Sequence, residues 1–508
     1  MELELNRSEL RGYDTVVDTT LFSEETLESI VPDACPDILR ILETDGVVCV
    51  KSREAGEGRA EVRGVIRTTV LYLPEENHEI CRMEVAIPFT CGIDHGGIGA
   101  AGVVQAVPRI LSADTRAINP RKVYIRVELA MGVKAFMPCI HEIVSDCGAA
   151  QETGVQEKRE KWQLYLTTTV QEKHFTFSDE LSLPGSKPDL AGLLRQRMDF
   201  CCSESKVIGN KLIFKGQVLL TILYKGSDGM PVTAPFELPF SQIMEVPGAA
   251  EEADCELNLL FNDFSCQPDP EDGRTLSVSM DLSAQAVLRE ERNLEVLTDL
   301  YSTDYELDTQ MKQESFCRLG ENGTRRLSVR EVVETPVEVK SVVDCAVSVG
   351  QVSQKREGSQ LILSADVRAA IFFRGEDDEL YAMTKSIPAS YQWEMAADCR
   401  CICRCQCPGE LYATPTMGGV EVRFPLDFDC RTEVPQELSA VCEARLVDDQ
   451  PRDKAQRPSI ILRMVEDGEC LWDIAKAYAT TEDDIRNANE LADACLPVGK
   501  LLLIPKKR

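Results

Sequence analysis

Apolar and polar residues alternate with a period of two through most of the chain. The alternation is clearest in three stretches rich in β-branched and aromatic residues: AEVRGVIRTTVLYL from Ala60, LIFKGQVLLTILYK from Leu212 and QLILSADVRAAIFF from Gln360. This period is typical of half-buried strands, because successive side chains point to opposite faces of a sheet. Turn residues at Gly226 and Gly375 fall where hairpins must reverse. The pattern therefore predicts a mainly β chain.

The three stretches belong to three copies of one unit. Pro32 recurs as Pro184, 152 residues later. The same shift pairs the following residues of the first and second copies: Pro36 with Pro188, Asp37 with Asp189, Gly64 with Gly216, and Tyr72 with Tyr224. The third copy is more diverged, because it lacks the Pro-Asp pair and carries Ala365 and Phe373 at the glycine and tyrosine positions. A fixed period over this many residues indicates an internal repeat.

The repeats divide the chain into a series of predicted domains. We expect three β-rich repeat domains, sandwich- or barrel-like, at residues 1–155, 156–312 and 313–442. Each should have one short helix after its Pro-Asp element, where Asp37 and Asp189 would act as caps or turn residues. The polar, proline-bounded residues 443–458 read as a linker. Residues 459–508 form a separate small domain.

The third copy contains a run of alternating cysteines, CRCICRCQCPG from Cys399. At the corresponding alternate positions the second copy has Cys255 followed by the larger apolar residues Leu257, Leu259 and Phe261. Residues i and i+2 of a strand lie about 6.6 Å apart, whereas thiolates around zinc lie about 3.8 Å apart. We therefore interpret the run as a buried or half-buried strand face. A metal site completed from elsewhere and a thiol patch that cross-links on oxidation remain the alternatives.

The last fifty residues follow the order strand, helix, helix, strand. Helical spacing of apolar residues from Leu471 to Tyr478 predicts the first helix, and Thr481 caps the second. This stretch resembles a LysM domain over its full length. The matching residues are Val465, Gly468, Leu471, Trp472, Ile474, Ala475, Ile485, Asn489, Leu503, Ile504 and Pro505. The expected fold is thus three tandem β-rich repeat domains and a small C-terminal βααβ LysM domain.

The resemblance to LysM implies a shallow groove between two loops that binds N-acetylglucosamine glycans. The groove residues it implies here are Asp467, Gly468, Glu469, Cys470, Leu471, Asn489, Glu490, Leu491 and Ala492. We expect Leu471 to line the groove wall and Trp472 to lie in the core. Glu469 and Cys470 replace the usual Asp-Thr pair, and Val498 is inserted between the usual Pro and Gly. These departures favour a groove that docks a protein.

The triplicated unit followed by one LysM domain resembles the SPOCS proteins of endospore-forming bacteria, of the SipL type. The resemblance implies a scaffold in the mother-cell cytoplasm at the forespore surface, and later in the spore coat. It would bind a coat-basement ATPase (SpoIVA-like) through LysM, and its repeats would pack against other coat proteins or self-associate. The alternative is a protein that binds peptidoglycan or spore cortex, with LysM reading N-acetylglucosamine glycans.

Composition and charge narrow the function further. A net charge of −30 disfavours nucleic-acid binding, and no apolar run approaches the roughly 18 residues of a transmembrane helix. The 21 cysteines without a signal peptide favour a reducing compartment. With four dispersed histidines, we expect no metal site and no cofactor. Cys91, Asp94 and His95 form the one nucleophile-like group, which we interpret as an ordinary turn. We therefore expect no catalytic residues and no enzyme.

Overall fold

Each of the three repeats is built from two antiparallel sheets packed face to face. The computed structural model describes residues 3–75, 79–148, 154–396, 398–447, 451–452, 460–491 and 498–505. In every repeat the long first strand pairs with the long last strand, and the fifth element adds a third strand. The three strands between them form a meander, and the meander of the first repeat also joins the second repeat through one parallel bridge, between Cys49 and Phe261. The apolar face of each sheet is buried between the two, which confirms a mainly β, sandwich-like repeat.

The strands of the repeats have nearly the same lengths and order. The first repeat contains β1 (Leu5–Ile30), β2 (Ile38–Gly56), β3 (Arg59–Pro74), β4 (Cys81–Asp94), β5 (Val103–Asn119) and β6 (Lys122–Cys147). The second contains β7 (Val155–Ser182), β8 (Leu190–Ile208), β9 (Lys211–Gly226), β10 (Pro231–Glu245), β11 (Asp254–Pro268) and β12 (Thr275–Ser302). The third contains β13 (Leu307–Glu334), β14 (Val339–Glu357), β15 (Gln360–Gly375), β16 (Leu380–Glu394), β17 (Arg400–Gln406), β18 (Tyr412–Thr416) and β19 (Gly419–Leu446).

The Pro-Asp elements start strands, and the short helices expected after them are wrong. Ile38 opens β2 by pairing with Pro74, and Leu190 opens β8 by pairing with Gly226. The apolar pair after each Asp belongs to a strand ladder, which claims the backbone groups that a helix would need. The helix expectation came from the aspartate as a cap, but this aspartate binds an arginine instead.

An arginine clamps the Pro-Asp turn in the first two repeats. Arg121 binds the Asp37 carboxylate at 3.1 Å and donates to the carbonyl oxygens of Val31 and Cys35. Arg274 occupies the same place in the second repeat, where it binds Asp189 at 2.5 Å. The repeat tyrosine closes the same turn, since the Tyr72 hydroxyl donates to the carbonyl oxygen of Pro36 at 3.1 Å and Tyr224 repeats this bond to Pro188 at 3.0 Å. The recurring residues of the sequence thus form one structural unit.

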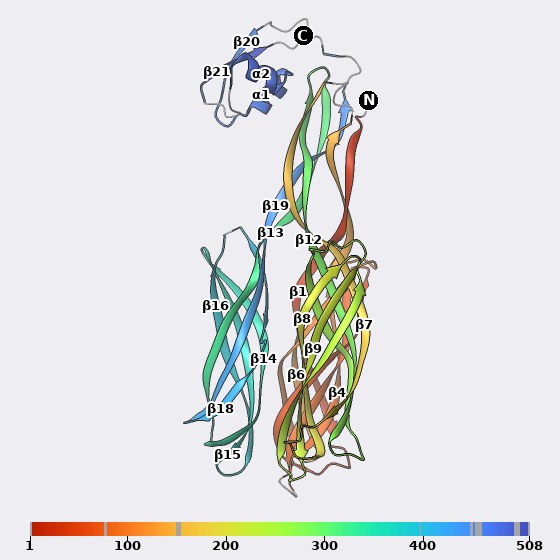
Figure 1. Cartoon of the computed structure of the whole chain (residues 1–508), viewed down its shortest axis with the longest axis vertical. Coiled ribbons are helices and arrows are strands. Elements are labelled where there is room, and N and C mark those ends of the chain that lie inside the picture. Colours follow the sequence, from red (N-terminus) through yellow and green to blue (C-terminus); the bar gives the residue numbers. More distant parts are fainter. Residues whose placement is uncertain are drawn as a thin grey trace.

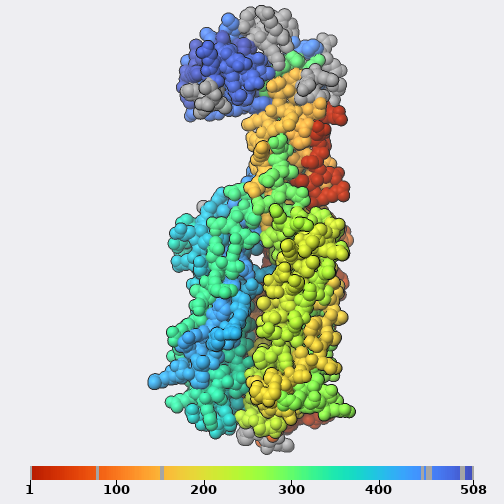
Figure 2. Space-filling view, in the orientation of Figure 1, coloured from red at the N-terminus to blue at the C-terminus, as the bar shows by residue number. Residues whose placement is uncertain are grey.

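The first and last strands of the repeats extend beyond the sandwiches and form a stalk. Figure 1 shows these strands converging above the broader lower body. Their ends bury a shared apolar core to which all three repeats contribute: Leu3, Val144, Cys147, Val155, Leu297, Leu300, Val441, Ala444 and Leu446. Figure 2 shows the stalk as a narrow neck between the lower body and the C-terminal domain. Because no single repeat could bury this core, the three repeats fold as one body.

The three meanders pack in a ring. Strand β4 contacts β8, β10 contacts β14, and β16 contacts β2, so each repeat meets the next in the same way. Equivalent apolar residues meet near the centre, namely Leu71, Leu223 and Phe372. Equivalent charged residues meet there as well: Arg195 of the second repeat binds Glu43 of the first and Asp344 of the third. The ring therefore joins equivalent positions of three copies through unlike charges.

A second buried charge cluster also joins all three repeats. Glu256 of β11 lies 3.2 Å from Lys134 of the first repeat, 3.0 Å from Arg289 of its own, and 3.1 Å from Arg404 of the third. Burial alone would raise the pKa of Glu256, but these cations together with Arg431 hold it well below its usual value. A carboxylate this well compensated stays ionised inside the protein.

The repeat glycines permit a close approach of two strands. A Cβ atom on Gly64 would overlap the carbonyl oxygen of Cys49 and lie 2.7 Å from the Phe89 ring. In the third repeat, Ala365 holds this position and the facing strand carries Gly350, whose added Cβ would lie 2.9 Å from the Asp366 carbonyl oxygen. In the third repeat the glycine therefore lies on β14, the strand that faces the position of Gly64.

We expect Gly64→Ala to destabilise the protein by about 1–3 kcal/mol, because the added methyl forces the backbone of β2 away. Thermal unfolding measures the loss. Gly96→Ala is the matched control, since nothing lies within 4 Å of an added Cβ there. Equal melting of the two variants would contradict the close packing.

The C-terminal domain has the expected order of elements. It contains β20 (Ile460–Met464), α1 (Leu471–Tyr478), α2 (Glu482–Ala488) and β21 (Leu501–Pro505). The two strands pair antiparallel, and both helices pack on one face of them. Of the region expected as a linker, residues 443–446 belong to β19, and most of the rest lies outside the described residues. Neither described helix has the length and apolar content needed to cross a bilayer.

Candidate functional site

The C-terminal domain is fixed to the tip of the stalk by β12. The Trp472 indole N–H donates to Asp299 at 2.7 Å, and the Lys476 ammonium binds the same carboxylate at 2.6 Å. The buried Tyr301 packs edge-on against Trp472 and donates its hydroxyl to the carbonyl oxygen of Thr480 at 2.7 Å. These contacts cover one side of α1. A partner must therefore bind another side of the domain.

The loop before α1 is held by its own side chains. Gly468 has a φ of +82°, which favours glycine. Glu469 accepts from the Glu466 backbone N–H at 2.9 Å and from Arg463 at 2.5 Å, and these bonds lower the pKa of its carboxyl. The Cys470 thiol lies 3.0 Å from the Asp473 carboxylate, and this bond lowers the pKa of Asp473. The loop's polar side chains thus serve its own conformation.

The loop after α2 is also held by hydrogen bonds within the domain. The Asn489 amide donates to the carbonyl oxygens of Ile485 and Leu503, both at 2.7 Å, and accepts from the Leu503 N–H at 2.6 Å. It ties the end of α2 to β21. Glu490 follows with a φ of +49°, Leu491 packs partly against the core, and Ala492 lies outside the described residues. Within the described part of the loop, Asn489 is not free to recognise a ligand.

Leu471 is a core residue, so our expectation that it lines the groove wall is wrong. Its exposed fraction is 2%, and it packs with Val465 and Ile485. The reason is its place at the start of α1, which points its side chain at the sheet. Trp472 is buried as expected, but it is also the residue that joins the domain to the stalk. Asp467 and Gly468 remain exposed on the loop.

The outer face of the β20–β21 sheet is apolar and uncovered. Ile460, Leu462 and Met464 are exposed by 64%, 62% and 61%, and Leu501, opposite Met464, by 54%. Both helices lie on the other face. The sequence already indicated this face. Both sets of alternate positions in β20 and the following Val465 contain apolar residues, but a two-stranded sheet with helices on one side buries only one of the two sets. These four side chains form an exposed apolar surface on the described part of the domain.

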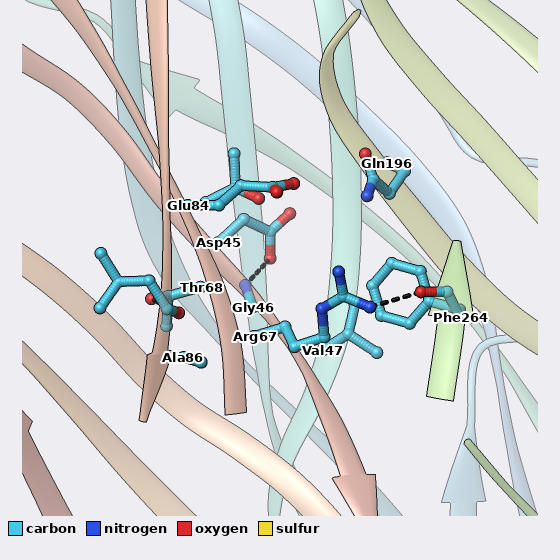
Figure 3. Close-up of a pocket in the computed structure, with 11 residues that line it drawn as sticks. Asp45, Gly46, Val47, Arg67, Thr68, Glu84, Ala86, Gln196 and Phe264 are labelled. Atoms are coloured by element: carbon cyan, nitrogen blue, oxygen red, sulfur yellow. Dashed lines mark hydrogen bonds between the residues drawn. The ribbon is translucent and has the colours of Figure 1, made fainter. Parts of the chain in front are cut away.

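A pocket of about 190 Å³ lies between the first and second repeats. Figure 3 shows the residues that line it: Asp45, Gly46, Val47, Arg67, Thr68, Thr69, Glu84, Val85, Ala86, Gln196 and Phe264. Its charged groups already have partners. Asp45 accepts from Arg197 at 2.9 Å, and the Arg67 guanidinium lies 4.4 Å over the Phe264 ring while binding Asp263. The pocket offers no pair of free groups for acid–base chemistry.

The one nucleophile-like group found in the sequence is not assembled. Cys91 is 6% exposed and points into the sandwich. Asp94 binds Arg59 at 3.0 Å, and the exposed His95 accepts from the Gly97 N–H in the turn after β4. Burial raises the pKa of the Cys91 thiol, which disfavours a nucleophilic thiolate. This arrangement is an ordinary turn beside a buried cysteine.

Three of the alternating cysteines, Cys401, Cys403 and Cys405, lie on β17, and the run lines the core of the third repeat, as expected. Cys405 is buried in the core of the third repeat, and Cys399, Cys401, Cys403 and Cys407 pack partly against it. Cys403 lies opposite Cys430 on β19, with 3.5 Å between the two sulfur atoms. These cysteines are free thiols. They fill the position that larger apolar residues fill in the second repeat.

Comparison with known families identifies three regions of the chain. Residues 37–118 and 189–268 match the family model described as "SipL, SPOCS domain", and residues 464–505 match the LysM domain. The two SPOCS matches run from the Asp of each Pro-Asp turn through the meander and β5 or β11. No significant match was found among curated proteins or among solved structures.

Proposed function

From a chain that carries two SPOCS domains and a C-terminal LysM domain, we propose a non-enzymatic scaffold for spore-coat assembly. It docks onto a coat-basement ATPase of the SpoIVA type through LysM. Its β repeats pack against other coat proteins or against further copies of the chain. It works in the mother-cell cytoplasm at the forespore surface and later remains in the spore coat.

The observation that carries this proposal is the uncovered apolar face of LysM. The stalk holds the domain away from the three sandwiches, as Figure 2 shows. It presents Leu462, Met464 and Leu501 outward while α1 is bound to β12. Exposed apolar patches of this kind commonly mark protein interaction sites. A partner that covers this sheet face would meet no competing contact from the rest of the described chain.

The body below the stalk supports a scaffold rather than an enzyme. The buried charges at its centre are paired across the repeats and fix them to one another. The pocket between the first two repeats has no free ionisable pair. Domains of the SPOCS and LysM families are non-catalytic. A body of three joined repeats with one exposed docking domain would hold the proteins bound to it at a fixed separation.

A second candidate function rests on the LysM match itself, because such domains read N-acetylglucosamine glycans. The chain would then bind peptidoglycan or spore cortex through the loops at Asp467–Leu471 and after Asn489. The internal bonds of Glu469 and Asn489 favour protein docking over glycan recognition. The two functions use different surfaces of one domain, which makes them separable.

We expect the double variant Leu462→Gln/Met464→Gln to weaken binding of the ATPase by at least about tenfold, because central apolar contacts dominate interface energies. Both residues are exposed, so folding should be unchanged. Biolayer interferometry with the full chain and purified ATPase measures the affinity. Met417→Gln is the matched control, since Met417 is 99% exposed on the turn between β18 and β19.

Unchanged affinity of the double variant would contradict docking through this sheet face. Sedimentation of the full chain with purified peptidoglycan tests the second function separately. Cosedimentation that persists in the double variant, together with no ATPase binding by the unmodified chain, would replace the scaffold with a glycan-binding protein.

A further inference from the structure

Three potential metal ligands from two strands meet in the stalk. Asp14 lies on β1, and Cys139 and His141 lie on β6. Their ligand atoms all lie within 4.8 Å of one another. Asp14 lies about 125 residues before the other two in the sequence, so no local motif contains all three. Only the pairing of the first strand with the last brings them together.

The local register explains the cluster. Asp14 pairs with Met137, Gly12 with Cys139, and Leu10 with His141, so the side chains of interest share one face of the ribbon. Gly12 contributes no side chain between Asp14 and His141. A Cβ there would lie 2.6 Å from the Thr167 carbonyl oxygen of β7, so the ribbon is packed tightly at this point. Asp14 therefore reaches across the glycine toward the imidazole.

A carboxylate from another repeat orients the imidazole. His141 Nδ1 lies 2.8 Å from Glu314 Oε2 on β13, and the ring packs edge-on against Phe316. Because a carboxylate accepts, Nδ1 carries the proton and donates it to Glu314. In the neutral ring the lone pair of Nε2 then faces Asp14. A carboxylate that fixes the far nitrogen of a histidine is the usual second partner of a metal-binding imidazole.

The distance between His141 and Asp14 suits a metal ion better than a direct bond. His141 Nε2 and Asp14 Oδ1 are 3.6 Å apart, which is too long for a hydrogen bond. Two ligands bound tetrahedrally to zinc at about 2.0–2.1 Å lie about 3.3 Å apart. The Asp14 side chain is 58% exposed, which leaves a path from solvent. Sulfur, imidazole nitrogen and carboxylate oxygen together are ligands that zinc accepts.

We propose that Asp14, Cys139 and His141 bind one zinc ion, with water as the fourth ligand and Glu314 holding the imidazole. Binding releases the proton of the Cys139 thiol, because the thiolate is the ligand. Through Glu314, the ion joins the β1–β6 ribbon of the first repeat to β13 of the third. The site is a structural clamp within the stalk and takes no part in the LysM docking surface.

The test measures zinc and cobalt binding to the purified full chain after treatment with a chelator. We expect tight binding of one zinc ion that is lost in Cys139→Ser and His141→Gln, and retained in Cys317→Ser, a half-buried cysteine of the same stalk. Cobalt should give a thiolate charge-transfer band that Cys139→Ser removes. Glu314→Gln should weaken zinc binding about 10–100-fold.

A second measurement does not depend on the total metal content. Zinc should protect Cys139 from alkylation, as located by mass spectrometry of peptides, while Cys317 reacts at an unchanged rate. Zinc binding equal in the unmodified chain and Cys139→Ser would place the ion at other thiols and overturn the proposal. Absence of tight binding would also overturn it.

Discussion

Replacing Arg195 with methionine is expected to destabilise the protein by about 3–5 kcal/mol, the cost of leaving buried charges without their partner. Arg195 is 2% exposed and binds Glu43 and Asp344 directly, with Asp45 at 3.8 Å. In its absence three acidic side chains from two other repeats would share Arg197 alone. Burial already raises the pKa of Glu43 despite both arginines.

Chemical denaturation of the full chain measures this loss, and two further variants test its cause. The triple variant Arg195→Met/Glu43→Gln/Asp344→Asn should recover most of the stability, because it removes the uncompensated charges together with the arginine. Arg11→Met should change stability by less than about 0.5 kcal/mol, since that side chain is 75% exposed. If Arg195→Met is as stable as Arg11→Met, the charges do not hold the ring together.

Tyr72→Ala and Tyr224→Ala are each expected to cost about 3–5 kcal/mol, the range for removing a buried aromatic ring. Both residues are 0% exposed, and each donates its hydroxyl to the carbonyl oxygen of the proline in its Pro-Asp turn. Burial raises the pKa of both phenols, so the hydroxyls remain donors. The alanine variants lose the ring from the sandwich core and the bond that closes the turn.

Phenylalanine variants separate these two losses. Tyr72→Phe and Tyr224→Phe keep the ring and should cost only about 1 kcal/mol, the usual net value of one hydrogen bond. Phe373 is the natural counterpart in the third repeat, where no Pro-Asp turn needs closing. Calorimetric melting of the four variants checks the order. Melting temperatures of the alanine variants equal to those of the phenylalanine variants would show that the rings contribute little.

Local patterns in the sequence were sufficient to predict the strands of the repeats. Alternation located β3, β9 and β15. Helical spacing located the first helix of LysM, and the cap at Thr481 located the second. Whether a stretch forms a strand or a helix depends on which of its side chains are buried, and the spacing of its apolar residues gives that pattern.

Contacts between copies could not be predicted in this way. The sequence around Arg195 does not indicate that its partners are Glu43 and Asp344. These residues meet only because the ring brings equivalent positions of the three copies together. The helix expected after Asp37 failed for a related reason, since Arg121, 84 residues later, binds that aspartate. Both errors concern side chains whose partners are distant in the sequence and are found only once the repeats have folded.

The candidate site was predicted in part. The LysM fold and its two loops follow from the sequence, whereas the burial of Leu471 and the use of Trp472 to bind Asp299 depend on the packing of α1. The cluster of Asp14, Cys139 and His141 could not be predicted, because β2 to β5 separate β1 from β6 in the sequence.

The unbroken course of the outer strands has a mechanical consequence. Strands of 26 to 28 residues run from the sandwiches to the tip, and at about 3.3 Å per residue each spans about 90 Å. A pull on the C-terminal domain would load their hydrogen-bond ladders lengthwise, so that many bonds would share the force at once. We expect the stalk to behave as a stiff strut that resists a lengthwise pull on its end.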